Sequence, residues 1–526
     1  MDKQQVRQQT AQQVLSLWKK GKEYLSQPLW GGKSLYERVE INNQFYEGEQ
    51  WPDNSGDLPM FNICKQIGQA QISVIGSNSL TARYSWEGVG DEENVPATAG
   101  ELARYFGHLP DGRPDDAELR AAAALMNRYF RTVSDRTRLD IRVKEVIEDA
   151  YKFGCGVLYF YWNEDHGAAG ELEVEPVEII RVFFGDPSIP QVQKQPYILL
   201  ESRRPLQEVR TQAEIDGLSG EEIASLRADN PPSGEEDGKT TVLVKFWKEG
   251  DRVYAVKTCG GVLLRDRWDI GIPYYPIALM RYERKRGTIY AHTPLTEIIP
   301  NQRVANTLRY NQVLQDSYSA QPILVYDSSR ISEVTNEIGG RIPVTGNISD
   351  SIRYLQGANM AASSENLANI FIQDTMDVSN VNAALRGNMN PYNTSAIIAL
   401  RDAAKMPLQM HTANLYDMFE DIARIIGSFI LAFYGDRVLC IEEKGRVYYI
   451  PFQADRYRNA ALTARVDVGE SALWSETAAV RTLDNLLASG VITPRQYLER
   501  MPNGYVPGRR ELLDELEEDI PDPIIS

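Results

Sequence analysis

Residues 386–435 read RGNMNPYNTSAIIALRDAAKMPLQMHTANLYDMFEDIARIIGSFILAFYG, and the interpretation of the whole chain depends on this stretch. Its opening part, residues 386–393, is rich in Gly, Asn and Pro, which favour a loop over a regular helix or strand. From Thr394, a residue type that caps helices, apolar side chains recur every three or four residues as far as Gly435. We therefore expect one amphipathic helix of about 60 Å, kinked where Pro407 removes a backbone hydrogen-bond donor.

Taken alone, such a helix is typical of a core element or a coiled-coil partner, and such a loop is usually a simple connection. His411 falls on the apolar face of the helix, where we expect a structural histidine with its hydrogen bonds satisfied rather than a general base. The stretch alone therefore does not distinguish between these roles.

The composition is that of a globular protein with an unusual charge. The chain has 526 residues, 43% hydrophobic and 25% charged, which is enough for several domains with a substantial core. The formal net charge of −17 argues against wrapping nucleic acid, because that requires a basic surface that displaces counterions. The negative charge is compatible with a protein past which a polyanion moves without binding to it. A high negative charge often does no more than keep a protein soluble.

The cysteines and the apolar runs indicate a soluble protein of a reducing cytoplasm that is not exported by the usual route. The four cysteines are scattered, with no CxxC motif and no nearby histidine pair, so neither a disulfide framework nor a metal site is expected. They are Cys64, Cys155, Cys259 and Cys440. The Gln-rich amino terminus lacks the apolar core of a signal peptide, and the most apolar run, residues 425–434, is about half as long as a membrane span.

No set of residues predicts catalysis or a cofactor. The four histidines form no HExxH motif and lie near no Gly-x-Ser-x-Gly motif. Gly32-Lys33-Ser34 resembles the end of a phosphate-binding loop, but residue 27 is Gln where the leading glycine should be, and no strand precedes it. The acidic residues between 511 and 519 could bind a metal, yet such runs are usually solvated.

Helices and strands are both predicted in residues 1–293. Apolar spacing predicts helices over residues 1–27, over residues 35–47 ending at Gly48, and over one continuous stretch from Ala117 to Phe153. Runs of β-branched and aromatic residues predict strands over residues 157–162, 173–182, 197–202, 242–247 and 253–256.

The residue composition of the chain changes at Pro294. Residues 294–320 are spaced as a helix but rich in amides, which suits a helix that faces solvent or packs against copies of itself around something polar. Short strands are predicted over residues 323–326, 341–344 and 352–355, and a helix returns over 361–385. After Gly435 we expect strands over 438–442, 447–452 and 462–468, then helices to the acidic end.

Two features resemble the portal proteins of tailed bacteriophages. The first is the string Asn42, Phe45-Tyr46 and Gly48-Glu49-Gln50-Trp51 near the amino terminus. The second is the order of elements: a helix, Gly154-Cys155-Gly156, strands and an Asp-Pro, and later a helix, a small β module, a returning helix, a loop and a long helix. The resemblance covers residues from about 42 to 519.

The resemblance implies an α+β subunit divided into the parts of a portal protein. These would be a wing over 1–293, a stem helix over 294–320, a clip over 321–357, a second stem helix over 358–385, a tunnel loop over 386–393, the long kinked wing helix with strands over 394–470, and a helical crown with an acidic tail over 471–526.

The resemblance also implies a function without catalysis or cofactor. Portal proteins form a ring of twelve subunits at one capsid vertex of the virion, after assembly in the host cytoplasm. Double-stranded DNA passes through the ring, and the expected partners are the terminase large subunit, a head-completion or adaptor protein, and the major capsid and scaffolding proteins, with no membrane. Twelve copies would carry roughly −200 charges, which would repel DNA from the channel wall.

Particular residues acquire expected roles from the resemblance. The tunnel loop would offer exchangeable contacts to DNA through Arg386, Asn388, Asn390, Tyr392 and Asn393. Arg303 and Arg309 are candidates for basic rings in the stem, although each could equally form an ion pair between subunits. The clip would meet its partners through Ile323, Tyr326, Arg341 and Arg353.

Two other classes of function remain open. A cytoplasmic scaffold or adaptor would use the long helix as a coiled-coil seam and form a dimer or trimer. A nucleic-acid enzyme would use the carboxylates with Mg²⁺ and lose activity when they are removed.

Overall fold

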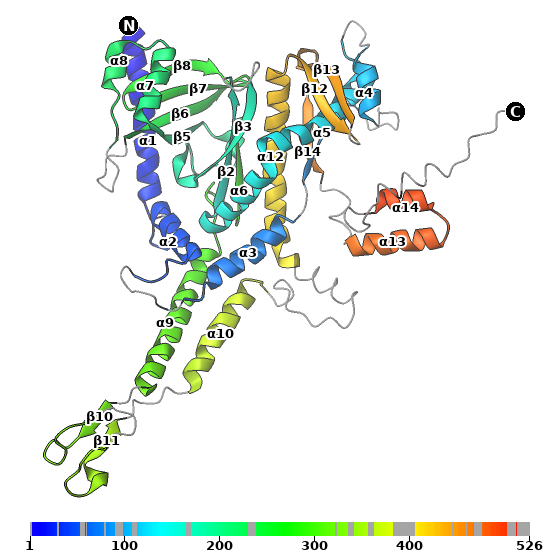
Figure 1. Ribbon diagram of the computed structural model, residues 1–526. Helices are drawn as coiled ribbons and strands as arrows, with labels where there is room; N and C mark the ends of the chain where they lie inside the picture. Colours follow the sequence, from blue (N-terminus) through cyan, green and yellow to red (C-terminus); the bar gives the residue numbers. More distant parts are fainter. Residues whose placement is uncertain are drawn as a thin grey trace.

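The computed structural model describes residues 3–28, 31–52, 58, 60–77, 80–89, 98–107, 113–164, 170–229, 238–320, 323–334, 341–355, 362–381, 405–443, 446–458, 460–467, 476–501 and 512. Figure 1 shows a body of helices and sheets from which two helices, α9 (Leu295–Ala320) and α10 (Ala362–Val378), extend to a small sheet at their far end. We call the described residues between 295 and 381 the stalk, and the rest the body. The mixture of helices and strands confirms the predicted α+β class.

Helices dominate the first third of the body. In order, the elements are α1 (Lys3–Ser26), α2 (Leu35–Glu47), α3 (Ile63–Ile75), β1 (Thr81–Trp86), α4 (Ala99–Phe106), α5 (Asp116–Thr137) and α6 (Leu139–Phe153). Ser34 and Glu37 cap the start of α2 reciprocally, and Gly48 ends it at a φ of 101°, as predicted. The continuous helix expected from Ala117 to Phe153 is wrong, because Arg138 takes a left-handed φ of 51° that separates α5 from α6.

Two antiparallel sheets follow. One has the order β4 (Val182–Phe184), β5 (Tyr197–Pro205), β6 (Lys239–Glu249), β7 (Arg252–Cys259) and β8 (Val262–Asp269). The other has the order β3 (Glu171–Val177), β2 (Cys155–Asn163) and β9 (Ile277–Arg281). Between the strands lie η1 (Ile179–Arg181), η2 (Val192–Lys194), α7 (Leu206–Ile215) and α8 (Gly220–Ser225). The strand expected over 173–182 is therefore too long, since a 3₁₀ turn follows Glu178.

The carboxyl-terminal part returns the chain to the body. Its described elements are η4 (Met406–Leu408), α12 (Gln409–Phe433), β12 (Asp436–Glu443), β13 (Arg446–Gln453), η5 (Ala454–Tyr457), β14 (Leu462–Asp467), α13 (Glu476–Ala488) and α14 (Pro494–Arg500). The irregularity expected at Pro407 takes the form of the 3₁₀ turn η4, after which α12 begins. Residues 394–404, where the long helix was expected to start, lie outside the described residues.

Helix α12 lies at the centre of the largest apolar core. Its side chains Ile422, Ile425, Ile426 and Ile430 are fully buried, together with residues of α3, α5, α6 and β9. Gly427 allows a close approach, because a Cβ there would lie 2.8 Å from both Leu462 of β14 and the Tyr84 ring of β1. The apolar face that the sequence predicts for this helix therefore packs in the core of its own chain.

Strands from the two halves of the chain pair with each other beside this core. β1 pairs antiparallel with β14, from Thr81 opposite Asp467 to Trp86 opposite Leu462. The buried carboxylate of Glu118 on α5 accepts hydrogen bonds from Nε and Nη2 of Arg456, each at 2.9 Å, and from the Tyr457 hydroxyl at 2.9 Å. Residues before and after the stalk thus form one body.

Candidate functional site

The stalk is anchored to the body by buried amides. Gln302 is fully buried; its Oε1 accepts from the backbone N–H of Ile63 at 2.8 Å, and its Nε2 donates to the carbonyl of Phe61 at 2.7 Å. Nε2 also donates to Asn306 at 2.9 Å, and Asn306 donates to Gln50 at 2.7 Å. Two of the amides that make α9 look polar therefore fix its root to the start of α3.

The two arginines proposed for the stem make contacts within their own chain. The guanidinium carbon of Arg303 lies 4.9 Å from the ring centre of Phe45, and its side chain is exposed. Arg309 donates to Gln312 at 3.2 Å on its own helix and to Asn369 of α10 at 2.6 Å. Arg309 thus joins the two stalk helices, and a place for either arginine on a channel wall stays a prediction.

The tip of the stalk is a two-stranded antiparallel sheet, β10 (Ile323–Tyr326) with β11 (Ile352–Leu355), at the boundaries predicted from the sequence. Tyr326 is 42% exposed, and Arg341 and Arg353 are also exposed, while the side chain of Ile323 is outside the described part. The predicted partner-binding side chains that are described therefore face solvent at one end of the molecule.

The third strand expected at the tip, over 341–344, is wrong. These residues have no regular structure, and the chain returns to β11 through the 3₁₀ turn η3 (Ile348–Asp350). Pro343 lacks the backbone N–H that would pair with a neighbouring strand. The N–H of Thr345 donates instead to the carbonyl of Arg330, at 3.1 Å. The segment folds back as a loop instead.

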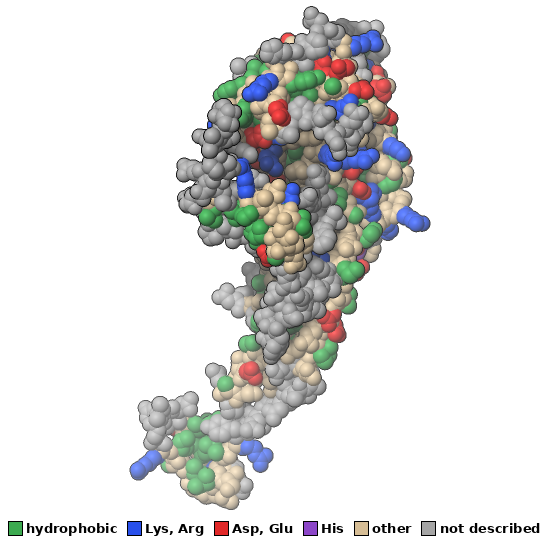
Figure 2. All heavy atoms as spheres, turned by 90° about the vertical axis from the view of Figure 1, so that its right-hand side faces the viewer, with side chains coloured by type: hydrophobic (Ala, Val, Ile, Leu, Met, Phe, Trp, Pro, Cys, Tyr) green, Lys and Arg blue, Asp and Glu red, His purple; other side chains and the backbone are tan. Residues whose placement is uncertain are grey.

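Apolar side chains are exposed along the whole stalk, which sequence reasoning missed. They are Val304 and Val313 on α9, Leu367, Ile370 and Val378 on α10, and Val325, Tyr326 and Ile348 at the tip, with exposed fractions between 38% and 79%. Figure 2 shows hydrophobic side chains gathered at the tip with basic side chains on either side. Exposed apolar side chains that gather in one place are typical of protein contact surfaces.

The joint between stalk and body holds a cluster of ionisable side chains. Nδ1 of His292 lies 3.1 Å from Oε2 of Glu283, and Nε2 of His411 on α12 lies 3.8 Å from Oε1 of the same carboxylate. The hydrogen bond between His292 and Glu283, together with the more distant imidazole of His411, lowers the pKa of Glu283 to about 2. Nδ1 of His411 is buried and has no hydrogen-bond partner among the described residues.

The residues predicted to contact DNA lie outside the described residues; they are Arg386, Asn388, Asn390, Tyr392 and Asn393. Their role in a tunnel loop therefore remains a prediction.

Metal binding and membrane insertion find no support in the described residues. Within the part of the chain that the structure describes, no group of three His, Cys, Asp or Glu side chains could hold a metal ion. None of the described helices combines the length and apolarity that crossing a membrane requires. The four cysteines are free thiols, with Cys64, Cys155 and Cys259 buried.

Comparison with known proteins links this architecture to one family. Residues 207–470 match the family described as Phage P22-like portal protein. The matched region spans the five-stranded sheet from β6 onward, the entire stalk, α12 and the strand β14. No curated protein matches the chain significantly.

Proposed function

The chain belongs to the phage P22-like portal protein family, a structural family, and on that premise we propose that it forms a ring at one vertex of a phage capsid. Double-stranded DNA is packaged and ejected through the centre of this ring. The ring has twelve subunits and docks the terminase large subunit, a head-completion or adaptor protein, and the major capsid and scaffolding proteins. The subunit has no catalytic role of its own, and it assembles in the host cytoplasm.

The observation that carries this proposal is the exposed apolar surface of the stalk. A single chain in water gains nothing by exposing Ile370, Leu367 and Val378 on one helix. In a ring, each stalk has a neighbour on both sides, and these side chains are buried between adjacent subunits. Burying one such side chain contributes about 1–2 kcal/mol, repeated at every interface of the ring.

The parts of the subunit follow from this arrangement. The tip, with Tyr326, Arg341 and Arg353, is the clip that meets terminase and adaptor. Residues 386–393 are the tunnel loop, and α9 and α10 are the stem. The net charge of −17 for each subunit agrees with a channel wall that repels a passing polyanion.

The two other classes of function fit the structure less well. A coiled-coil scaffold needs the stripe of α12 at its surface, whereas Ile422, Ile425 and Phe429 are 0–3% exposed inside the body. The acidic residues between 511 and 519 that a metal-dependent nuclease would use all lie outside the described residues, so that alternative has no described geometry in its favour.

The test is the mass of the purified chain in solution, with negative-stain images of the same sample. We expect a large assembly with a central hole. The double variant Ile370→Glu, Val378→Glu should remain folded but fail to form rings, because it places two charges in each stalk interface. The control Ile215→Glu changes a residue of the body that is 73% exposed, and should assemble as the unmodified chain does.

Two results would contradict the proposal. One is a discrete dimer or trimer of the unmodified chain that gives no rings at high concentration, which would favour the scaffold. The other is a double variant that forms rings as readily as the control, because the stalk would then make no contact between subunits.

A further inference from the structure

The two stalk helices lie side by side and run in opposite directions (Figure 1). Arg309 of α9 donates to Asn369 of α10 at 2.6 Å, and this contact shows which levels of the two helices are adjacent. Arg303 lies six residues before Arg309. Thr375 lies six residues after Asn369, and it therefore has the same height along the stalk as Arg303, because each helix rises about 1.5 Å per residue. Asp377 follows within the same turn, so Arg303 and Asp377 lie at nearly the same height.

Arg303 lies on the side of α9 that faces away from α10. Gln312 accepts a hydrogen bond of 3.2 Å from Arg309, the residue that contacts α10, and so marks the side that faces α10. Gln312 follows Arg303 by nine residues, which is about two and a half turns, so the two side chains leave the helix in opposite directions. Arg303 is exposed together with Val304 and Thr307. We call these three residues the outer face of α9.

Asp377 lies on the side of α10 that faces away from α9. Ala368 is 1% exposed, as expected of a residue that faces α9, and it precedes Asp377 by nine residues, so these two also point in opposite directions. Asp377 is exposed, as are Val378 beside it and Ile370 two turns earlier. We call these three residues the outer face of α10. Asp374 is also exposed, but it lies about 60° round the helix from Asp377, closer to α9.

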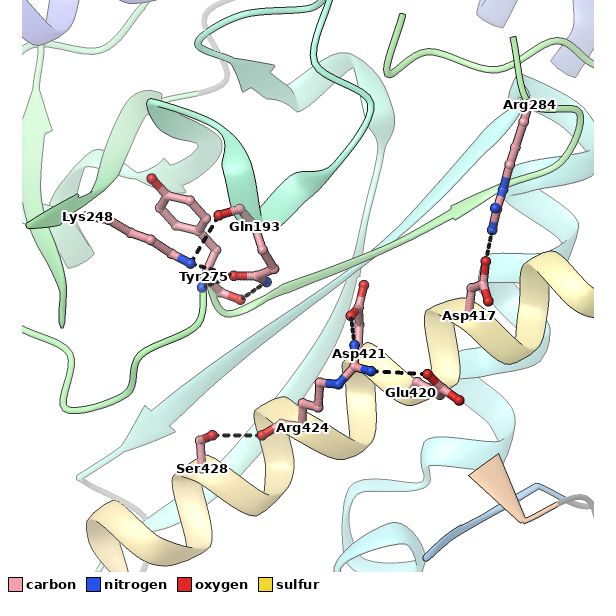
Figure 3. A network of polar contacts seen from close by, with 9 residues as sticks. All are labelled: Gln193, Lys248, Tyr275, Arg284, Asp417, Glu420, Asp421, Arg424 and Ser428. Carbon is pink, nitrogen blue, oxygen red and sulfur yellow. Dashed lines mark hydrogen bonds and ion pairs between the residues drawn. The ribbon is translucent and has the colours of Figure 1, made fainter. Parts of the chain in front are cut away.

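Neither charge of these outer faces is paired within the described part of the chain. Figure 3 shows an arginine that is paired within its own chain: Arg424 of α12 lies 3.1 Å from carboxylate oxygens of both Glu420 and Asp421. Among the described residues, no ion pair forms at Arg303 or at Asp377. The two lie on opposite sides of one stalk, so they cannot reach each other within a single chain.

We propose that Arg303 of one subunit forms an ion pair with Asp377 of the next subunit, so that the outer face of α9 packs against the outer face of the neighbouring α10. This inference rests on the proposed function, because it requires a ring. Rotation about an axis along the stalk moves every residue at constant height, so groups at one height on opposite sides of a stalk meet where two stalks are adjacent. The contact is head-to-tail, which is the kind of contact that closes a ring.

The side chains around the pair favour this contact. Val304 on one face and Ile370 and Val378 on the other are 38–79% exposed in the single chain, and packing the faces together removes them from water. Subunits of net charge −17 repel each other, and a pair of opposite charges at each contact offsets part of this repulsion and fixes the register of the two helices. Arg303 then lies between subunits and not on the channel wall.

The experiment is ring formation by the purified full-length chain, followed by mass and negative-stain images over a range of chain concentrations. Arg303→Glu places two carboxylates opposite each other and should raise the concentration at which half of the chains are in rings about tenfold. Combining Arg303→Glu with Asp377→Arg exchanges the two charges and should bring this concentration back to within about threefold of the unmodified chain.

The matched control is Arg227→Glu, which reverses an exposed charge of the body and should leave ring formation unchanged. Combining Arg227→Glu with Asp377→Arg gives the same net charge as the exchanged pair, but it should assemble as poorly as Asp377→Arg alone. A restored ring in the exchanged pair is then due to the contact and not to the total charge.

A second measurement does not depend on charge reversal. The variant with both Arg303→Cys and Asp377→Cys, treated as rings with a short bis-maleimide, should give a ladder of covalently joined chains in a denaturing gel, because the two positions can be joined only between subunits. The control is Arg303→Cys alone, which also reports any reaction of the partly exposed Cys440 and should remain a single chain.

The possible failures are distinguishable. This inference is overturned, and the proposed function is left standing, if Arg303→Glu forms rings as readily as Arg227→Glu, if the exchanged pair stays impaired, or if rings of the double cysteine variant give single chains after treatment. If the unmodified chain forms no rings, the proposed function fails, and this inference fails with it.

Discussion

The change Gln302→Met should detach the root of the stalk from the body. Methionine has nearly the length of glutamine but cannot replace its hydrogen bonds, so the N–H of Ile63, the carbonyl of Phe61 and the side chain of Asn306 each lose a buried partner. Each unsatisfied buried group costs about 1–3 kcal/mol. Allowing for relaxation, we expect a loss of about 3 kcal/mol in the free energy that holds α9 against α3.

Hydrogen exchange at the first turn of α3 and at residues 299–306 measures this loss where it occurs. A loss of about 3 kcal/mol corresponds to roughly a hundredfold faster exchange by local opening. The control is Asn311→Leu, at an exposed amide of the same helix, and it should change exchange at the root by less than about twofold. If Gln302→Met exchanges like this control, the amide network does not anchor the stalk.

Two further predictions concern buried and half-buried carboxylates. Glu118→Gln should lower the free energy of unfolding, measured in urea, by about 3 kcal/mol, because Arg456 loses its buried partner. The control Glu178→Gln removes one partner of an exposed ion pair and should lower the free energy of unfolding by about 0.3 kcal/mol. Equal effects of the two changes would show that burial of the ion pair does not determine its contribution to stability. Glu283 has its pKa lowered from 4.5 to about 2, so its ionised form stabilises the fold above pH 4.5, and this contribution disappears as the pH falls toward 2. The stability difference between the unmodified chain and Glu283→Gln should therefore shrink between pH 4.5 and pH 2.5, and a constant difference would refute this linkage.

Local signals in the sequence predicted the tip and the first helices well. The strands Ile323–Tyr326 and Ile352–Leu355 are short apolar runs between turn residues, and both boundaries are confirmed. The end of α2 at Gly48 follows from the one residue that adopts a positive φ without strain. Where one residue type determines the local backbone conformation, the sequence alone predicts where the helix or strand begins and ends.

Errors arose where a conformation depends on distant partners. Arg138 breaks a helix without Gly or Pro, because only the packing of both α5 and α6 on the core demands a break there. The strands β8 and β9 were not predicted, and both take their places by pairing with β7 and β2. A strand completed by its neighbours has only a weak signal of its own.

The amides of α9 were interpreted by composition, and composition does not distinguish their two environments. Gln302 and Asn306 are buried in a hydrogen-bond network, whereas Asn311 on the same helix is exposed. The network needs Gln50 and the backbone at Phe61, more than two hundred residues earlier. The cluster at the joint likewise joins residues from separate segments, so no local motif could have revealed it.

The pairing of β1 with β14 has a consequence for synthesis of the chain. Because Thr81 pairs with Asp467, strand β1 leaves the ribosome roughly 390 residues before its partner, a delay of about 20–80 s at ordinary rates of translation. During that time the apolar surface that α12 later covers is open to other chains. The body therefore reaches its final form only after the stalk has been made, and until then its incomplete core is open to aggregation.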